Sequence, residues 1–128
     1  MELRIGLQHT STIVVSTLTT AITMGSGDMP VFATPSMIAL MENAAMQAVR
    51  NALPEGCSTV GYAMDTTHIR PSGIGATITA TAILTEIEGR KLTFHVVAKD
   101  GNELIGEGTH KRCIVNEELF MAHVKSNH

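Results

Sequence analysis

The segment VFATPSMIALMENAAMQAV, Val31 to Val49, limits the fold more than any other part of the sequence. Thr34 is a good N-cap, Pro35 suits the first turn of a helix, and no further Gly or Pro occurs until Pro54. The segment therefore predicts a single helix of about 17 residues, which is longer than the average helix of a globular protein.

The predicted helix carries a carboxylate at an unusual position. With about 100° per residue, its apolar residues share one face and its polar residues gather on another. The apolar face holds Ile38, Met41, Ala45 and Val49, and the polar cluster holds Ser36, Asn43, Gln47 and Arg50. Glu42 falls at the edge of the apolar face. A carboxylate there needs hydrogen-bond donors and is often functional, but a glutamate that reaches solvent or a lysine explains the position equally well.

The rest of the chain after this helix has the pattern of β-strands. Strands are predicted for Ser58 to Ile69, Ala76 to Ile87 and Leu92 to Ala98, and an Asp-Gly turn leads into a fourth, ELIGEGTHKRCIV. Short turns between successive strands are typical of an antiparallel meander. Together with the helix, this predicts an α+β fold in which the helix covers one face of the sheet.

Three further segments complete the expected organisation. TSTIVVSTLTTAI, before the helix, predicts one or two short strands, and MGSGDMP predicts a loop or lid. At the other end, NEELFMAHVKSNH predicts a short helix capped by Asn116.

Composition excludes several classes of protein. Hydrophobic residues make up 44% of the chain and charged residues 16%, which indicates a folded protein, and we expect residues 1–128 to form a single domain. The net charge of −3, without a basic cluster, argues against nucleic-acid binding. No segment is apolar and long enough to cross a membrane. The absence of a signal-peptide pattern and the separation of Cys57 from Cys113 predict a cytoplasmic protein with free thiols.

The sequence contains few motifs with a chemical meaning. It lacks GxSxG, Walker A and GxGxxG motifs, and its histidines have no zinc-ligand spacing, so we expect no metal site. His68 lies at a strand end, where reactive groups are common, although an exposed turn histidine is the simpler explanation. Thr34 would place a hydroxyl beside the free N–H groups of the helix start. GEGTH, Gly106 to His110, indicates strand glycines that permit close backbone approach.

Three stretches of the sequence resemble a known family. VFATPSMIALMENAA, GYAMDTTHIRPSGIG and EIEGRKLTFHVVAKDGNELIGEGTHKR resemble hotdog-fold thioesterases of the fluoroacetyl-CoA thioesterase-like family, in one register from Val31 to about Phe120. The resemblance implies a hotdog fold, in which a curved antiparallel sheet wraps a long central helix. It also implies a homodimer with its sites at the subunit interface, and it leaves a tetramer open.

The resemblance also implies site residues. The family's catalytic residues fall on Thr34, Glu42 and His68, its backbone hydrogen-bonding glycine on Gly61, and its coenzyme A contacts on Gly75 and Arg112. Thr34 and Glu42 are two helical turns apart, about 12 Å along the axis, so that one substrate-sized space could touch both. No cofactor is implied beyond the coenzyme A that the substrate carries.

The implied activity is hydrolysis of an acyl thioester carried by coenzyme A or by an acyl carrier protein. Glu42 would act as nucleophile or general base, His68 of the partner subunit would shuttle protons, and Thr34 would orient the carboxylate or the substrate. The chain departs from the family in its lid, where Gly25 and Asp28 stand at the positions of phenylalanines, so the resemblance does not imply fluoroacetyl selectivity.

Two other functions stay open at this stage. Asp65 and His68 are close enough in sequence to suggest an enoyl-thioester hydratase. An acyl-thioester binding or sensing module would keep the same pocket with little turnover.

Overall fold

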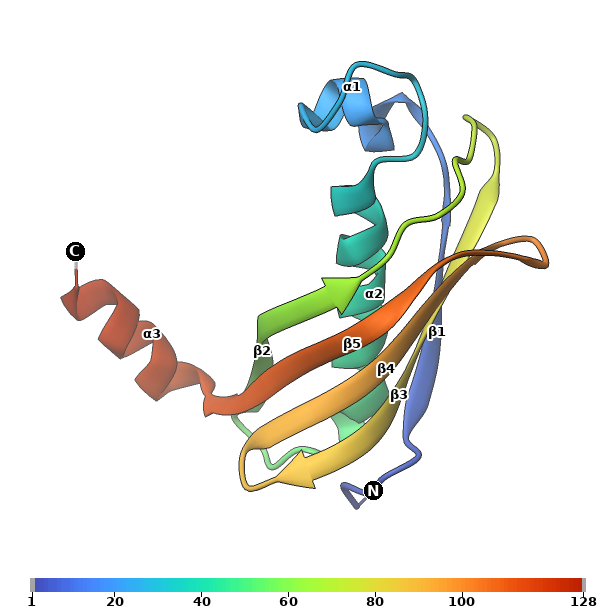
Figure 1. Cartoon of the computed structure of the whole chain (residues 1–128). Helices are drawn as coiled ribbons and strands as arrows, with labels where there is room; N and C mark the ends of the chain where they lie inside the picture. Colours follow the sequence, from blue (N-terminus) through green and yellow to red (C-terminus); the bar gives the residue numbers. More distant parts are fainter. Residues whose placement is uncertain (1, 128) are drawn as a thin grey trace.

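In the computed structural model, which describes residues 2–127, a curved five-stranded sheet wraps one side of a long helix (Figure 1). The strands are β1 (Gln8–Val14), β2 (Cys57–Thr66), β3 (Thr77–Glu88), β4 (Lys91–Asp100) and β5 (Glu103–Asn116). The helices are α1 (Ala21–Met24), α2 (Thr34–Val49) and α3 (Glu117–Ser126), with 3-10 turns η1 (Thr17–Thr19) and η2 (Arg50–Ala52). The predicted α+β architecture is confirmed.

The order of the strands differs from the prediction at one place. The order is β1-β3-β4-β5-β2, and all neighbouring strands are antiparallel. β3, β4 and β5 form the predicted meander. The prediction is wrong for β2, which pairs with β5 and not with β3. Residues 67–76 form a connection too long for a hairpin, and the backbone N–H of Ile69 within it donates to the Ile105 carbonyl (2.6 Å). β2 is consequently an edge strand of this sheet.

The segment before α2 contains β1, one of the one or two short strands predicted there, and the chain then turns into η1 and α1. The Ser16 hydroxyl accepts from the Leu18 N–H, and the Thr20 hydroxyl accepts from the Thr23 N–H. Both side chains therefore cap short helices. The following loop, around Gly25 to Pro30, is present as predicted.

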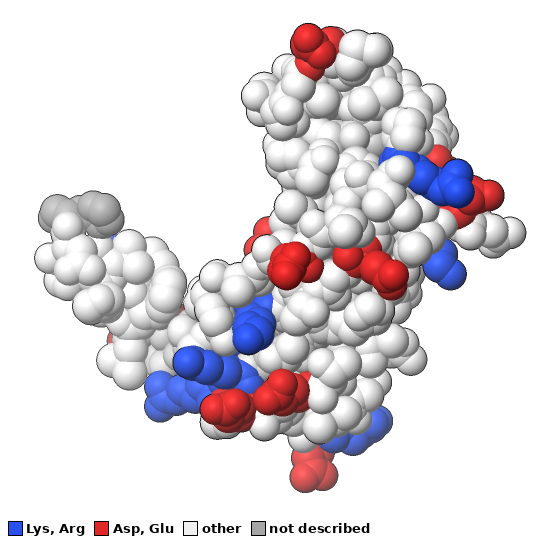
Figure 2. All heavy atoms as spheres, in the orientation of Figure 1, with Lys and Arg blue, Asp and Glu red and all other residues white. Residues whose placement is uncertain are grey.

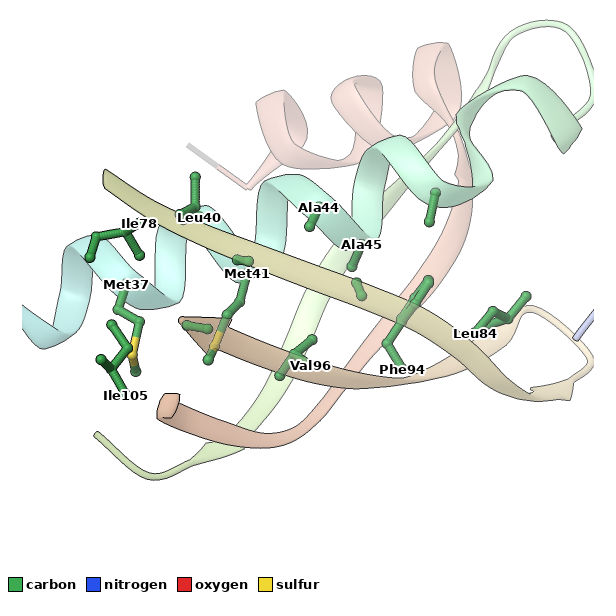
Figure 3. Packing of buried hydrophobic residues seen from close by; sticks show 14 of the residues in the cluster. Met37, Leu40, Met41, Ala44, Ala45, Ile78, Leu84, Phe94, Val96 and Ile105 are labelled. Atoms are coloured by element: carbon green, nitrogen blue, oxygen red, sulfur yellow. The ribbon is translucent and has the colours of Figure 1, made fainter. Parts of the chain in front are cut away.

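The long helix α2 forms as predicted, but its cap differs. Its N-cap is Ala33, so Thr34 and Pro35 are the first two helical residues, and no side chain caps the helix. The buried side of α2 lies against the sheet (Figure 3). Figure 3 shows α2 residues Met37, Leu40, Met41, Ala44 and Ala45 facing the sheet residues Ile78, Leu84, Phe94, Val96 and Ile105. Glu42 lies at the margin of this core.

Two glycines of β5 let the end of β2 cross closely over it. A Cβ on Gly108 would overlap the Asp65 carbonyl oxygen, and one on Gly106 would overlap that of Thr67. The predicted close backbone approach at these glycines is therefore confirmed. The register also shifts between Gly61 and Ala63 in β2, and such irregularities bend a strand and increase its twist. Both features set the course of the chain toward His68.

The C-terminal helix α3 forms as predicted and projects from the body of the molecule (Figure 1). The Asn116 side chain accepts from the Leu119 N–H (3.0 Å), and none of the described residues of α3 is buried. No helix among the described residues is long and apolar enough to span a membrane.

Candidate active site

Thr34 and His68 meet where the first turn of α2 touches the loop after β2. The Thr34 Oγ1 and the His68 Nδ1 are 2.7 Å apart, within hydrogen-bond distance. The loop is held on β5 on both sides of His68, because the Thr67 N–H donates to the Glu107 carbonyl and the Ile69 N–H to the Ile105 carbonyl. The Thr34 hydroxyl, predicted as a helix cap, is thus directed to His68 in the same chain.

The environment of His68 favours a neutral imidazole. The ring is half-buried with its edge toward the ring of Phe32 (centroids 6.4 Å apart), and burial lowers the pKa of His68 from its ordinary 6.5. Its Nε2 is buried and has no hydrogen-bond partner among residues 2–127, while the nearby Arg70 backbone opposes part of the fall in pKa. A neutral imidazole with one free nitrogen can accept a proton during a reaction and pass it on.

A cavity of about 310 Å³ opens beside this pair. Its lining comprises Thr34 and His68, residues of α1 and its loop including Ala21 and Ser26, and Phe32 and Arg70. Figure 2 shows few charged side chains over α1 and its loop on this face, whereas Lys, Arg, Asp and Glu interleave over the sheet. The α1 side of the cavity is therefore formed by small residues and carries little charge.

Glu42 lies in a second cavity, of about 260 Å³, together with Gly61 and His110. The Glu42 Oε2 is 3.9 Å from Arg112 Nη1, and the Glu42 side chain is 43% exposed. A Cβ on Gly61 would lie 2.9 Å from that carboxylate oxygen, so a side chain at this position would displace the carboxylate from its present place. No residue lines both this cavity and the one beside Thr34 and His68, so in the single chain the two groups lie in separate cavities.

Arg112 is buried beneath Glu42. Its Nε donates to Thr59 Oγ1 (2.8 Å), its Nη2 to the Thr59 carbonyl (2.9 Å), and its Nη1 lies 3.2 Å from His110 Nε2. Burial lowers the pKa of Arg112 and the Glu42 carboxylate opposes this shift, while an arginine stays protonated at neutral pH. The cluster therefore holds a fixed positive charge next to Glu42.

Gly75 lies outside both cavities, in the turn before β3. It has φ of 97°, and its N–H donates to the Val15 carbonyl (2.8 Å). The structure thus groups the six predicted residues as Thr34 with His68, Glu42 with Gly61 and Arg112, and Gly75 apart.

Sequence reasoning missed His110, which it considered only as a zinc ligand. His110 and Arg112 are two residues apart in β5, so alternation along the strand puts them on one face. That alternation was the available signal. No group of three or more His, Cys, Asp or Glu side chains that could hold a metal occurs among residues 2–127.

Comparison with known proteins agrees with this fold. A family model for fluoroacetyl-CoA-specific thioesterases matches residues 15–118. The fluoroacetyl-CoA thioesterase of Streptantibioticus cattleyicolor is 42% identical over 95 residues, which are 74% of this chain and 68% of the relative. A solved structure of the fluoroacetyl-CoA thioesterase FlK has a TM-score of 0.93 at 35% identity and covers 100% of this chain and 99% of its own.

A more distant structure shares the fold. The Thermus thermophilus hypothetical protein, a thioesterase superfamily member, has a TM-score of 0.88 at 23% identity and covers 96% of this chain and 91% of its own. The predicted hotdog fold is thereby confirmed. On the family match and the relative's identity, this chain belongs to the fluoroacetyl-CoA-specific thioesterase family.

Proposed function

We propose that this chain is a thioesterase that hydrolyses acyl-CoA at a site built by two copies. The observation that carries the proposal is the separation of two groups in one chain, the Thr34–His68 pair and a Glu42 carboxylate beside a buried arginine. Solved relatives include a FlK variant in complex with acetyl-CoA and another with fluoroacetate and CoA. These complexes support acyl-CoA as the class of substrate.

A homodimer formed through β2 would join the two groups. β2 is an edge strand, and its exposed backbone can pair with the β2 of a second copy. A two-fold axis perpendicular to that strand reverses the direction of α2 in the partner. We infer that this brings Thr34 and His68 of the partner subunit toward Glu42. His68 then comes from the partner, as expected from the sequence, and Thr34 comes with it.

In the proposed reaction, water attacks the thioester carbonyl while Glu42 accepts its proton. The carbonyl oxygen becomes an oxyanion that backbone N–H groups near Gly61 or at the start of α2 can stabilise. The C–S bond then breaks, and the proton that Glu42 took from water passes through Nε2 of His68 to the thiolate of coenzyme A, which regenerates the Glu42 carboxylate. A direct attack of Glu42, followed by hydrolysis of the resulting anhydride, balances equally well and stays open.

Thr34 and Arg112 have supporting roles in the proposal. The Thr34 hydroxyl fixes the ring of His68 through Nδ1. Arg112 is 6% exposed and two of its nitrogens bond to Thr59, so we assign it to Glu42 and not to the coenzyme A contact that the resemblance suggested. Gly75 stays a prediction as a coenzyme A contact.

The acyl group is set by the cavity beside His68. Its α1 side presents Ala21 and Ser26, which leave about 310 Å³ of space. We therefore propose that the site is not selective for fluoroacetyl. A cytoplasmic location is part of the proposal and fits the free thiols of Cys57 and Cys113.

The test is release of free thiol from short, branched, aromatic and long acyl-CoAs by the unaltered protein, Glu42→Gln and His68→Ala. Release that depends on both residues supports the proposal and names the acyl preference. If the folded, dimeric protein releases thiol from none of them, acyl-CoA hydrolysis is wrong for this panel. Acyl-carrier-protein thioesters would then be assayed, and product analysis would separate hydrolysis from hydration of an enoyl thioester.

A further inference from the structure

We propose that His110 is a positioning residue that fixes Glu42 through Arg112, and that it does so as a neutral imidazole with its proton on Nδ1. The inference rests on the proposed function, because it takes Glu42 as the reacting carboxylate. It extends that function by assigning a role to a buried histidine that does not belong to the Thr34, Glu42 and His68 set.

The hydrogen bonds of His110 define its tautomer. A guanidinium can only donate, so His110 Nε2, 3.2 Å from Arg112 Nη1, must be the accepting nitrogen. The other ring nitrogen, Nδ1, lies 2.8 Å from the Ala63 carbonyl oxygen, which can only accept. Nδ1 must therefore carry the proton. An imidazolium would direct a second N–H at the guanidinium, and burial, which lowers the pKa of His110, opposes that form.

His110 holds the one corner of Arg112 that faces Glu42. Thr59 accepts from Nε and Nη2, along the opposite edge of the guanidinium. Nη1 is the nitrogen nearest Glu42, at 3.9 Å, and its hydrogen-bond partner among residues 2–127 is His110. Without His110, the position of Nη1 would depend only on the planar geometry of the guanidinium and on the attraction of Glu42.

Glu42 depends on this support because its own position is open. Its side chain is 43% exposed, and Arg112 is the one cation within ion-pair distance of it in the described part of the chain. The Gly61 backbone limits the carboxylate on one side. A displacement of about 1 Å at a reacting group can lower the rate by about 100-fold. A fixed Nη1 is therefore a direct means of fixing the attacking geometry.

His110 itself does not take part in proton transfer in this account. Both of its ring nitrogens are committed, one to Arg112 and one to the Ala63 carbonyl. The competing role is purely structural, in which His110 only anchors the irregular part of β2 through Ala63. The two roles depend on different nitrogens and can be separated by substitution.

The side-chain amides of Gln and Asn can each replace one ring nitrogen of His110. His110→Gln places an amide near the position of Nε2, where it can accept from Arg112, and His110→Asn places one near Nδ1, where it can donate to Ala63. In His110→Asn we expect kcat to fall about 10- to 100-fold and KM to change less than about 3-fold. In His110→Gln we expect kcat to fall less than about 5-fold. In the Glu42→Gln background, His110→Asn should add less than about a 2-fold loss, because both act on the same carboxylate.

The opposite order overturns the proposal. If His110→Asn retains more activity than His110→Gln, or if its loss is undiminished in the Glu42→Gln background, His110 acts through Ala63 and the stability of β2. Melting temperatures and oligomeric state of both variants are measured alongside. A loss of kcat that follows the fall in melting temperature in both variants would also contradict a positioning role.

A second measurement needs neither variants nor turnover. Long-range ¹H–¹⁵N correlation spectra of the histidine-labelled unaltered protein at pH 7 distinguish a protonated ring nitrogen from a lone-pair nitrogen. We expect His110 as the Nδ1–H tautomer, and an Nε2–H tautomer or an imidazolium would refute the inference. Failure to release thiol in the acyl-CoA assay would refute the proposed function alone, since the tautomer is read independently.

Discussion

Thr34 and His68 meet between a helix end and a loop, whereas Glu42 lies over side chains that project from two paired strands, β2 and β5. The first pair has one hydrogen bond between side chains and an uncommitted Nε2. The second group is a connected set in which Thr59 and His110 each bond to Arg112 beneath the carboxylate.

This contrast suggests that the two groups have different roles in the reaction. A strand-borne cluster is held by the sheet ladder and suits a group whose geometry must be fixed before the substrate arrives. A loop-borne histidine with a free ring nitrogen suits proton transfer. Substitutions can test whether the fixed, strand-borne part and the loop-borne part contribute in this way.

The largest effect is expected from the fixed part. Glu42→Gln keeps the shape of the side chain but removes its basicity, so kcat should fall about 1,000-fold while the melting temperature changes little. Thiol release under saturating substrate measures it. Glu86→Gln, at an exposed carboxylate of β3, is the matched control and should leave kcat unchanged. If kcat of Glu42→Gln stays within about 10-fold of that of the unaltered enzyme, Glu42 is not the base or nucleophile of the reaction.

His68→Ala should lower kcat by about 100-fold and also change the pH profile. The pKa of His68 is lowered below 6.5, so the neutral, active form persists at pH 7 and above, and activity falls only as the pH drops through that lowered value. In His68→Ala this acid limb should disappear. His123→Ala, an exposed histidine of α3, is the control. An acid limb that survives in His68→Ala would assign it to another group.

Gly108→Ala tests how the fold places His68. The added Cβ would overlap the Asp65 carbonyl, so the end of β2 must move, at an expected cost of about 1–3 kcal/mol in the free energy of unfolding. Urea unfolding measures it, and kcat should fall with the displacement of the His68 loop. Gly73→Ala is the control, because a Cβ there meets nothing within 4 Å. Equal stability of the two variants would show that the close crossing of β2 and β5 does not constrain the loop.

The smallest effect is expected outside both groups, in α3. Asn116→Ala removes the cap, worth about 1 kcal/mol to a helix, but none of the described residues of α3 is buried. Faster amide exchange in α3 with kcat within about 2-fold of the unaltered enzyme is the predicted result. A large loss of activity would mean that α3 contributes to the site in the assembled protein.

Local patterns in the sequence predicted most of the fold. The length of α2 followed from the spacing of Pro35 and Pro54, and the strand positions followed from alternation and turn residues. The Asn116 cap was also predicted correctly. The position of β2 in the sheet was not predicted correctly. Whether β2 pairs with β3 or with β5 depends on long-range contacts that no local pattern encodes.

The candidate site was predictable as a set of residues but not as an arrangement. The resemblance gave Thr34, Glu42 and His68, yet the hydrogen bond between Thr34 and His68 depends on how the loop after β2 crosses β5. The place of His110 beside Arg112 was visible in the alternation of β5, but its contact with Ala63 forms only when β2 pairs with β5. The role of His110 could therefore not be predicted before the strands were paired.

The central claim is that one site takes Thr34 and His68 from one subunit and Glu42 from the other. Mixing the inactive His68→Ala and Glu42→Gln proteins under conditions of subunit exchange tests it most directly. A mixed dimer would contain one intact site, so a 1:1 mixture should recover about a quarter of the unaltered rate. No recovery, with mixed dimers demonstrated by mass spectrometry, would contradict the claim and place all three residues of a site in one chain.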